Sequence, residues 1–450
     1  MATYNQGIVN VGTPGEPASG YHTRRLFNFS DRVADLAPEE SPFFVYLSKV
    51  AKVPTDDPQF RFLEDRTKIS MTDRSFLLNG SHSVPAAGSS LTYTVDTSAG
   101  ASVDFLIKGM VFAVEYAENN APETIIVRVE SSPVDNGDTS SFVGKTISSV
   151  DGAEAPADNA KCTVIGTSFV EGSGSPDVFS EELTSDSGLT QIFKTACEMS
   201  NTARATRYRG YADEFQRIWN LKLREHKVDI ERAMLFGQRA STGGIQYSEG
   251  IAGHILANGT AVTGTSDLSY SSGTPYYRSA TTAQLTYDRI LSDFEVVYDP
   301  ARGGTDSKLA LASLPVITFF NKLGADAFLN TSLVSGTSTA VNDVSNLRYN
   351  MEKTQGSFGH TVLQIETIHG TMNLVKEPLF RGFASGFLCM VDMDNVAYRP
   401  LVGNGVNRDT QIMTNVQSAD EDLRKDMILT EAGLEVSLPE SHMLIHLQGV

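Results

Sequence analysis

Short runs in which apolar and polar residues alternate occupy the chain between residues 60 and 180. The segments "SLTYTVD" (90–96) and "TIIVRVE" (124–130) carry an apolar residue at every second position, which is typical of strands with one buried face. The apolar runs "FLIKGMVFAVEY" (105–116) and "AKCTVIGTSF" (160–169) are bounded by glycine and turn residues. Together these segments predict a small β-sandwich or β-barrel.

At residue 183 the apolar period changes to that of an amphipathic helix. In "LTSDSGLTQIFKTACEMSNTARA" (183–205), the helical spacing is carried by Leu189, Ile192, Phe193, Ala196 and Met199. Apolar residues at i, i+3, i+4 and i+7 predict a helix over this segment.

A second and longer helix is predicted over 211–239, and it carries two apolar stripes. The first stripe consists of Phe215, Trp219, Leu223, His226, Ile230 and Met234. The second, on a roughly opposite face beside Arg217, consists of Leu221, Val228 and Leu235. Charged residues, Lys227 and Glu231 among them, fill the gaps. Because a surface helix normally has one stripe, we expect this helix of about 43 Å to lie wedged between two layers.

The remainder of the chain reads as mixed helix and strand. A helix is predicted over 285–300 and ends at Asp299-Pro300, since the residue before a proline disfavours helical backbone. "KLALA" (308–312) is a predicted strand, and 313–324 is a predicted short helix with Pro315 in its first turn and Gly324 at its end. Strands return in the last 75 residues, so the fold class is α+β.

The first 58 residues are predicted to form an extended arm. Turn and breaker residues dominate this segment, and its one apolar patch, Phe43 to Leu47, lies between prolines. Such a patch cannot by itself offset the entropy of ordering the segment. Because Phe43, Phe44 and Tyr46 are unfavourable to leave exposed, we expect the arm to become ordered against another surface.

Composition and charge narrow the class of protein. The 450 residues are 40% hydrophobic and carry a formal net charge of −18, which is typical of a folded chain that does not bind nucleic acid tightly, because phosphate binding depends on Lys and Arg. Cys162, Cys197 and Cys389 show no metal-binding spacing and are expected to be reduced thiols. The chain shows no signal peptide and no apolar run of membrane-spanning length. We therefore expect it to be made and folded in the cytoplasm.

The candidate chemical sites are each better explained as structural residues. His226 lacks the second histidine of an H-E-x-x-H zinc motif and is expected to pack in the first stripe. The "GKT" at 144–146 has Thr139 where a phosphate-binding loop needs glycine, and it is predicted to be a turn between strands. The "GFASG" at 382–386 lacks the spacing of a nucleophile elbow.

Two further pairs of residues are also interpreted as structural rather than chemical. His442 and His446 are expected on one side of a strand as ordinary strand histidines, because no third metal ligand is evident. Asp392 and Asp394 are expected at a solvated strand end, since they lack the glycine and terminal glutamate of a calcium loop. We predict no catalytic, cofactor-binding or metal-binding residues.

Several long segments resemble the HK97-type major capsid proteins of tailed bacteriophages, in a subfamily related to the phage SU10 major head protein. "TQIFKTACEMSNTARATRYRG" (190–210) and "DEFQRIWNLKLREHKVDIERAMLFGQR" (213–239) are similar to the region that leads into and forms the spine helix of that subfamily. "RDTQIMTNVQSADEDLRKDMILTEAGLEVSLPESHMLIH" (408–446) resembles its closing region, and "FVEGSGSPDVF" (169–179) resembles the junction before its helical part.

The resemblance implies a division of the chain. Residues 1–58 would form the N-terminal arm, and 59–182 the extended loop with an inserted β-domain at about 101–170. Residues 183–283 would form the peripheral domain, including the spine helix at 211–239. Residues 284–375 would form the axial domain, and 376–450 the closing strands shared by both domains. The inserted β-domain and the loops at 258–282 and 331–345 are the parts that the resemblance constrains least.

The same resemblance implies a function and partners. Many copies would assemble in the host cytoplasm into hexamers and pentamers of an icosahedral phage head, which encloses double-stranded DNA that it contacts weakly. Portal, scaffolding and decoration proteins are implied as further partners, and the absence of a helical scaffolding segment at the start implies a separate or removed scaffold. No membrane, cofactor or enzymatic activity is implied. The alternatives are an encapsulin-like compartment, a tail-tube or decoration protein, and an α/β enzyme with a β-barrel appendage.

Overall fold

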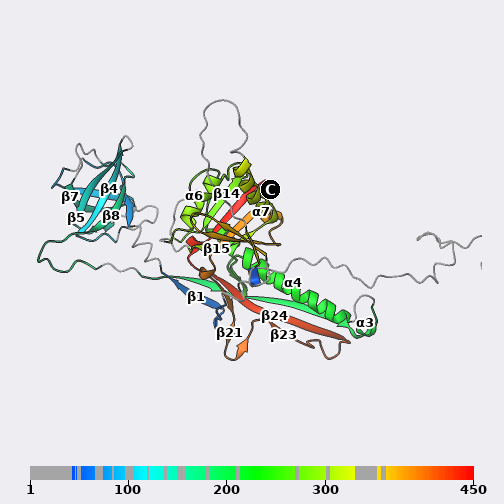
Figure 1. Cartoon of the computed structure of the whole chain (residues 1–450). Coiled ribbons are helices and arrows are strands. Elements are labelled where there is room, and N and C mark those ends of the chain that lie inside the picture. The colour runs from blue at the N-terminus through cyan, green and yellow to red at the C-terminus, as the bar shows by residue number, and fades with distance from the viewer. Residues whose placement is uncertain are drawn as a thin grey trace, which may run out of the picture. The chain divides into compact units, whose positions relative to one another are not determined.

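The computed structural model describes residues 43–45, 47, 52–65, 74–83, 86–96, 103, 105–118, 121–135, 139–148, 156, 158–178, 182–208, 213–268, 273–300, 305–329, 352–355 and 361–449 (Figure 1). Internal contacts separate the chain into two compact units. Of the described residues, the first unit holds those of Lys194–His226 and Ile412–Leu429, and the second holds those of Ser41–Phe193, Lys227–Gln411 and Thr430–Val450. Helix α4 (Glu214–Phe236) and strands β10 (Gln191–Ser200) and β24 (Leu423–Val436) contribute residues to both units.

The second unit contains a mixed eight-stranded sheet. Its strand order is β13-β14-β25-β19-β15-β18-β17-β16. The bounds are β13 Thr260–Thr263, β14 Tyr276–Thr281, β25 Met443–Gln448, β19 Phe387–Val391, β15 Ser307–Ala312, β18 Thr371–Lys376, β17 Thr361–Glu366 and β16 Glu352–Gln355. Strand β14 runs parallel to β13 and β25, and β15 runs parallel to β18, whereas β19 is antiparallel to both of its neighbours.

Both faces of this sheet are covered, as the alternation of side chains along β15 shows. Leu309 and Leu311 enter one apolar cluster, whereas Ala310 and Ala312 enter the other, because successive strand residues point to opposite faces. Helices α6 (Tyr287–Val297) and α7 (Leu314–Leu329) contribute to the second cluster. The C-terminal half of α4 and helix α5 (Ile251–Asn258) contribute to the first.

Strands β2 to β8 form a separate barrel with its own core. Their bounds are β2 Ser75–Leu77, β3 Ser90–Asp96, β4 Met110–Glu118, β5 Ala121–Val129, β6 Val134–Asp135, β7 Thr139–Ser148 and β8 Lys161–Thr167. The strand order is β2-β8-β4-β5-β7-β3, with β6 beside β7. A bridge between Leu78 and Val95 joins the end of β2 to β3, which closes the barrel.

Aromatic side chains fill the barrel. Tyr93, Phe112 and Phe142 contact one another with ring centroids 5.6–5.8 Å apart, and Phe76 packs against the last two. Gly144 makes room for them, because a Cβ there would lie 2.6 Å from Val127 Cγ1 and 3.0 Å from the Tyr93 ring. The barrel therefore has a tightly packed interior rather than a ligand cavity.

Elongated elements complete both units. Strands β10, β24 and β20 (Val396–Pro400) pair in that order, and β23 (Gln411–Met413) also pairs with β24. In the second unit, β1 (Gln59–Glu64) and β9 (Thr184–Leu189) form a two-stranded antiparallel ribbon, and β11–β12 (Ala240–Thr242, Ile245–Tyr247) and β21–β22 (Val402–Gly403, Val406–Asn407) are short hairpins. In the first unit, α3 (Asn201–Ala205) follows β10, and Cys197, Met199 and Phe215 form a small core. In the described part of the chain, strands are connected by the single 3-10 turns η3 Gly382–Ala384, η4 Met393–Asn395 and η5 Pro439–Ser441.

The helix predicted over 183–205 is wrong for most of its length. The segment forms β9 and β10, and helix appears only in α3 after Ser200, which caps it. The apolar residues of "QIFKTACEMS" fit a helical period, but Phe193, Cys197 and Met199 are also at even spacing and are buried in the strand. Pairing with β24 decides between the two periods, and that partner lies more than 200 residues away in the sequence.

Other expectations are confirmed with shifted boundaries. Helix α6 and strands β3, β4, β5, β8 and β15 lie where the apolar pattern predicts them. Helix α4 begins at Glu214, because Asp213 caps it by accepting from the N–H groups of Phe215 and Gln216. It ends at Phe236, before Gly237, where any Cβ would meet the Ser248 carbonyl at 2.4 Å. Its 23 residues span about 34 Å, which is shorter than expected.

One predicted helix end and one predicted turn are wrong. Helix α7 continues through Gly324 to Leu329, since a single glycine inside a helix costs only about 1 kcal/mol. The "GKT" at 144–146 lies within β7 rather than in a turn, because Gly144 is needed for close packing in the barrel. The loop at 331–345 lies outside the described residues, as does most of the arm predicted over 1–58.

The close packing at Gly144 predicts a specific defect in the barrel. Gly144→Ala places a methyl group against Val127 and Tyr93, and overpacking of this kind costs about 1–3 kcal/mol. We expect amide hydrogen exchange of β3, β5 and β7 in the full chain to accelerate accordingly. Gly174→Ala is the control, because no atom lies within 4 Å of its Cβ position. Equal exchange in the two variants would contradict a tightly packed interior.

Candidate functional site

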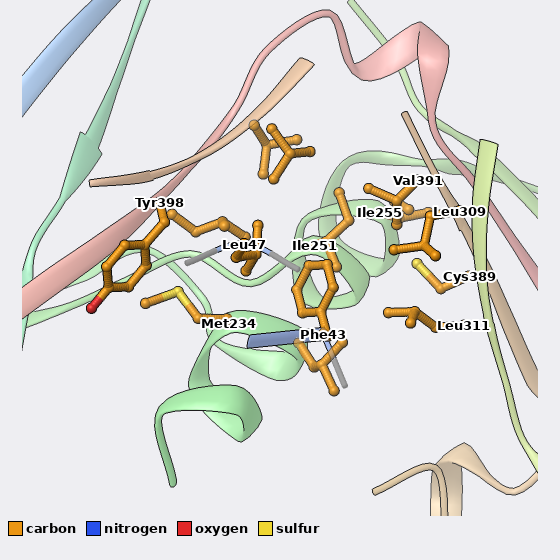
Figure 2. Close-up of a cluster of buried hydrophobic side chains, with 14 of the residues drawn as sticks. Phe43, Leu47, Met234, Ile251, Ile255, Leu309, Leu311, Cys389, Val391 and Tyr398 are labelled. Carbon is orange, nitrogen blue, oxygen red and sulfur yellow. The ribbon is translucent and has the colours of Figure 1, made fainter. Parts of the chain in front are cut away.

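Residues 43–45 and 47 form a helical segment, here named the anchor, that inserts into the core of the second unit. Phe43 and Leu47 are both 0% exposed, whereas Phe44 and Val45 are half-buried. Figure 2 shows Phe43 and Leu47 pointing into an apolar cluster. The other labelled members of the cluster are Met234, Ile251, Ile255, Leu309, Leu311, Cys389, Val391 and Tyr398. The expectation of packing against a surface is confirmed for Phe43 and Phe44, and the surface is the chain's own core. Tyr46, which the same expectation included, lies outside the described residues.

The residues that follow the anchor are held by backbone hydrogen bonds to β20. The N–H groups of Val53 and Thr55 donate to the carbonyls of Tyr398 and Pro400, each at 2.9 Å, so residues 52–55 run parallel to β20. The ring of Phe44 meets that of Tyr398 edge-on, with centroids 5.6 Å apart. Lys52 forms an ion pair with Asp409, which also accepts from the Tyr398 hydroxyl.

The energetics of the anchor are set by two side chains. Burying Phe43 and Leu47 stabilises the docked segment by about 1.5–3 kcal/mol each. Ordering the backbone costs roughly 1–2 kcal/mol per residue. The burial of the two side chains therefore offsets the entropy of ordering only a few residues. The backbone pairing of residues 52–55 with β20 helps to offset the remaining ordering entropy.

Two buried carboxyl groups lie at the anchor. Glu231 on α4 is 0% exposed and Glu377, directly after β18, is 2% exposed. The Phe43 N–H donates to Glu231 Oε1 at 2.9 Å, and the Leu379 N–H donates to Glu377 Oε1 at 3.1 Å. Burial, and then the neighbouring Glu377, raises the pKa of Glu231 to about 10; burial raises the pKa of Glu377 to about 7. The prediction that Glu231 fills a polar gap on the helix surface is wrong.

His226 is a packed histidine, as its place in the first stripe predicts. It is 1% exposed, and its Nδ1 lies 2.9 Å from the Thr195 hydroxyl of β10. The first stripe is buried or half-buried along its whole length. The second stripe is uneven within the single chain, since Leu235 is 0% exposed, Val228 is half-buried and Leu221 is 53% exposed.

Asp392 and Asp394 differ from the prediction of a solvated strand end. Asp394 is exposed, but Asp392 is buried beside Lys308, whose Nζ lies 3.4 Å from Asp392 Oδ2 and donates to the Ser441 carbonyl at 2.9 Å. Asp392 also accepts from the Thr305 hydroxyl at 2.9 Å. The sequence hid this pair because Lys308 lies on β15, whereas Asp392 directly follows the neighbouring strand β19 and is 84 residues away in the chain.

The two candidate histidines near the C-terminus are structural. His442 precedes β25 rather than lying within it, and its Nδ1 accepts from the Asp392 N–H at 3.2 Å. Burial, followed by the nearby Lys308, lowers the pKa of His442 to about 3, so the ring is neutral. His446 meets Phe387 edge-on at 5.1 Å, and burial lowers its pKa.

The described residues show no candidate metal centre. No group of three or more His, Cys, Asp or Glu side chains within them is placed to hold a metal ion. Cys162, Cys197 and Cys389 are buried thiols. In the segment 382–386, Gly382–Ala384 is a 3-10 turn with Ala384 buried. None of the helices in the described part of the chain is long and apolar enough to cross a membrane.

Comparison with known proteins supplies the family. The sequence profile of the SU10 major capsid protein family matches residues 6–448, which is almost the whole chain. The chain belongs to the SU10 major capsid protein family. It is therefore a major capsid protein of the tailed-phage type with an α+β fold, and a structural component of the virion rather than an enzyme. Capsid proteins of this family assemble into shells of many copies.

Several solved structures are similar to this chain. The capsid of a native GTA particle is 9% identical over 97% of this chain and 99% of that chain, with a TM-score of 0.41. The Microbacterium phage Oxtober96 structure is 9% identical over 95% and 98%, with a TM-score of 0.44. The holo-SrpI encapsulin complex from Synechococcus elongatus PCC 7942 is 11% identical over 59% and 77%, with a TM-score of 0.35. No curated protein sequence matches this chain.

The burial of Phe43 predicts that the anchor depends on it. Phe43→Ala removes a fully buried ring, and such truncations cost about 3–5 kcal/mol. We expect limited proteolysis within residues 41–52 of the full-length subunit to become much faster. Phe383→Ala, at a ring that is 69% exposed, is the control and is expected to cost less than about 1 kcal/mol. Cleavage at an unchanged rate in Phe43→Ala would show that the anchor does not hold this segment.

Proposed function

We propose that this capsid protein assembles into hexamers and pentamers of an icosahedral head that encloses double-stranded DNA. The observation that carries the proposal is membership of the SU10 family over residues 6–448. In this proposal residues 1–58 act as the N-terminal arm, 59–182 as the extended loop with its β-barrel, and 183–283 as the peripheral domain. Residues 284–375 act as the axial domain, and 376–450 as closing strands.

The incompletely buried elongated elements support assembly. Among the described residues β1 pairs with β9 and with no other strand, and an isolated two-stranded ribbon is marginally stable in water. Large apolar side chains are exposed on such elements or directly beside them, namely Leu63, Leu183, Leu221, Ile245, Val406 and Ile412. Contacts with other copies of the chain would bury these side chains, since association adds the apolar burial that the single subunit lacks.

The charge of the chain supports weak contact with packaged DNA. With 54 acidic and 36 basic residues, the inner surface is proposed to be poor in Lys and Arg, so that dense DNA is enclosed without being bound tightly. Portal, scaffolding and decoration proteins are proposed as further partners, and assembly is proposed to occur in the host cytoplasm.

Negative-stain microscopy of the purified protein tests the proposal directly. We expect hexamers, pentamers or closed shells, and in particles from the native source we expect DNA inside. A discrete monomer under all assembly conditions would overturn the assembly proposal. Shells that enclose a cargo protein instead of DNA would replace the phage head by an encapsulin-like compartment.

The second stripe of α4 gives a residue-level prediction for assembly. If a neighbouring copy covers Leu221, then Leu221→Glu buries a charge at an apolar contact, which costs several kcal/mol and lowers the assembled fraction more than tenfold. The free subunit is expected to keep its stability within about 0.5 kcal/mol. The matched control is Asn220→Glu, which adds the same charge at an exposed neighbour on the same helix. Normal shell yield from Leu221→Glu would show that this face is not an interface.

A further inference from the structure

The two carboxyl groups at the anchor each have one oxygen without a donor. Glu231 Oε1 and Glu377 Oε1 accept from backbone N–H groups, but Oε2 of each residue is buried and has no donor among the described residues. The two side chains lie within hydrogen-bonding reach of each other. An ionised carboxylate cannot donate, so the two orphaned oxygens can satisfy each other only when the pair holds a proton.

Among the residues that the structure describes, no cation compensates the pair. The groups that act on Glu231 are Glu377 and the N–H groups of Phe43 and Phe44 of the anchor. Those that act on Glu377 are Glu231 on α4 and the Leu379 N–H of the following turn. Two adjacent carboxylates in a buried site cannot both ionise without a large electrostatic cost. A shared proton removes one of the two charges and supplies the missing donor.

A bound divalent cation fits this site poorly. A cation would need further oxygen ligands, whereas the groups that reach the carboxyls from the anchor and from the 379 turn are N–H donors. No third His, Cys, Asp or Glu among the described residues completes a metal-binding group here. The geometry therefore favours the proton.

We propose that Glu231 and Glu377 share a proton and form a pH-sensitive latch that fixes the anchor to helix α4. Loss of the shared proton leaves two buried negative charges, and water must enter to solvate them. Glu231 lies on the 23-residue helix α4. Glu377 directly follows β18, a strand of the eight-stranded sheet. The anchor is the smallest of the three elements, so it is the one that opens.

The direction of the pH dependence follows from the raised pKa values. An opened, hydrated pair ionises near the ordinary glutamate pKa, whereas the closed pair keeps protons to higher pH, because the pKa is about 7 for Glu377 and about 10 for Glu231. The stability of the closed state is thus greatest in acid and falls as pH rises. Between pH 7 and 9 the closed pair holds about one proton more than the open pair, so opening increases up to tenfold per pH unit.

Hydrogen exchange of the peptide that contains residues 43–47 tests the latch in the full-length subunit. Glu231→Gln is the decisive variant, because its amide donates permanently to Glu377 while its oxygen still accepts from Phe43. We expect the ratio of wild-type to Glu231→Gln exchange rates to rise about 100-fold from pH 7 to pH 9. Taking the ratio at each pH removes the pH dependence of the chemical exchange rate. A flat ratio would overturn the proposal.

Two further variants and an infrared measurement ensure that the test does not depend on Glu231→Gln folding correctly. Glu377→Gln is expected to reproduce the behaviour of Glu231→Gln, and Asp229→Asn, at an exposed carboxyl on the same helix, is expected to follow the wild type. Infrared spectra at pH 7.5 should show a protonated carboxylic acid in the wild type that both Gln variants lack. Anchor protection that increases with calcium chloride and falls with EDTA would instead assign a cation to the site and refute the shared proton.

Discussion

The apolar cluster around Phe43 and Leu47 is the interaction on which the second unit depends. A sheet that is apolar on both faces must be covered on both, and α6 and α7 cover only one face of the eight-stranded sheet. The other cover is assembled from pieces, namely the C-terminal half of α4, helix α5 and the anchor. Strands β20 and β24 contribute to the same cluster, so it links the elongated strands to the sheet. Loss of any one piece exposes the apolar side chains of the others.

The barrel follows a different logic, because it is self-contained. Closure between β2 and β3 removes its free edges, and the described residues of its apolar core all lie between Phe76 and Val164. The ribbon of β1 and β9 has neither closure nor a full core. In the proposed assembly this difference matters, because elements that are incomplete in one subunit would gain stability from association.

Much of the fold could be predicted from the sequence where one physical signal dominates. Helix α6 has a single apolar face, a Thr286 cap and a terminal proline region, and all three agree. The barrel strands alternate cleanly because their interior is closed. The family could be inferred because long stretches of the sequence are similar to those of the SU10 group, although no single motif defines the group. The apolar stripe predicted a packed His226, and the residue lies buried beside Thr195.

The features that sequence reasoning missed all depend on partners distant in the chain. Strand β10 carries both a helical and a strand period, and only the pairing with β24 selects the strand. Glu231 and Asp392 look like surface carboxylates, because nothing within a few residues of either indicates Glu377 or Lys308. Polar residues can be buried only where such partners satisfy them, so a buried charged residue reports a long-range contact. For that reason the anchor carboxyls, which neither periodicity nor motif reveals, are where the sequence departs most from local rules.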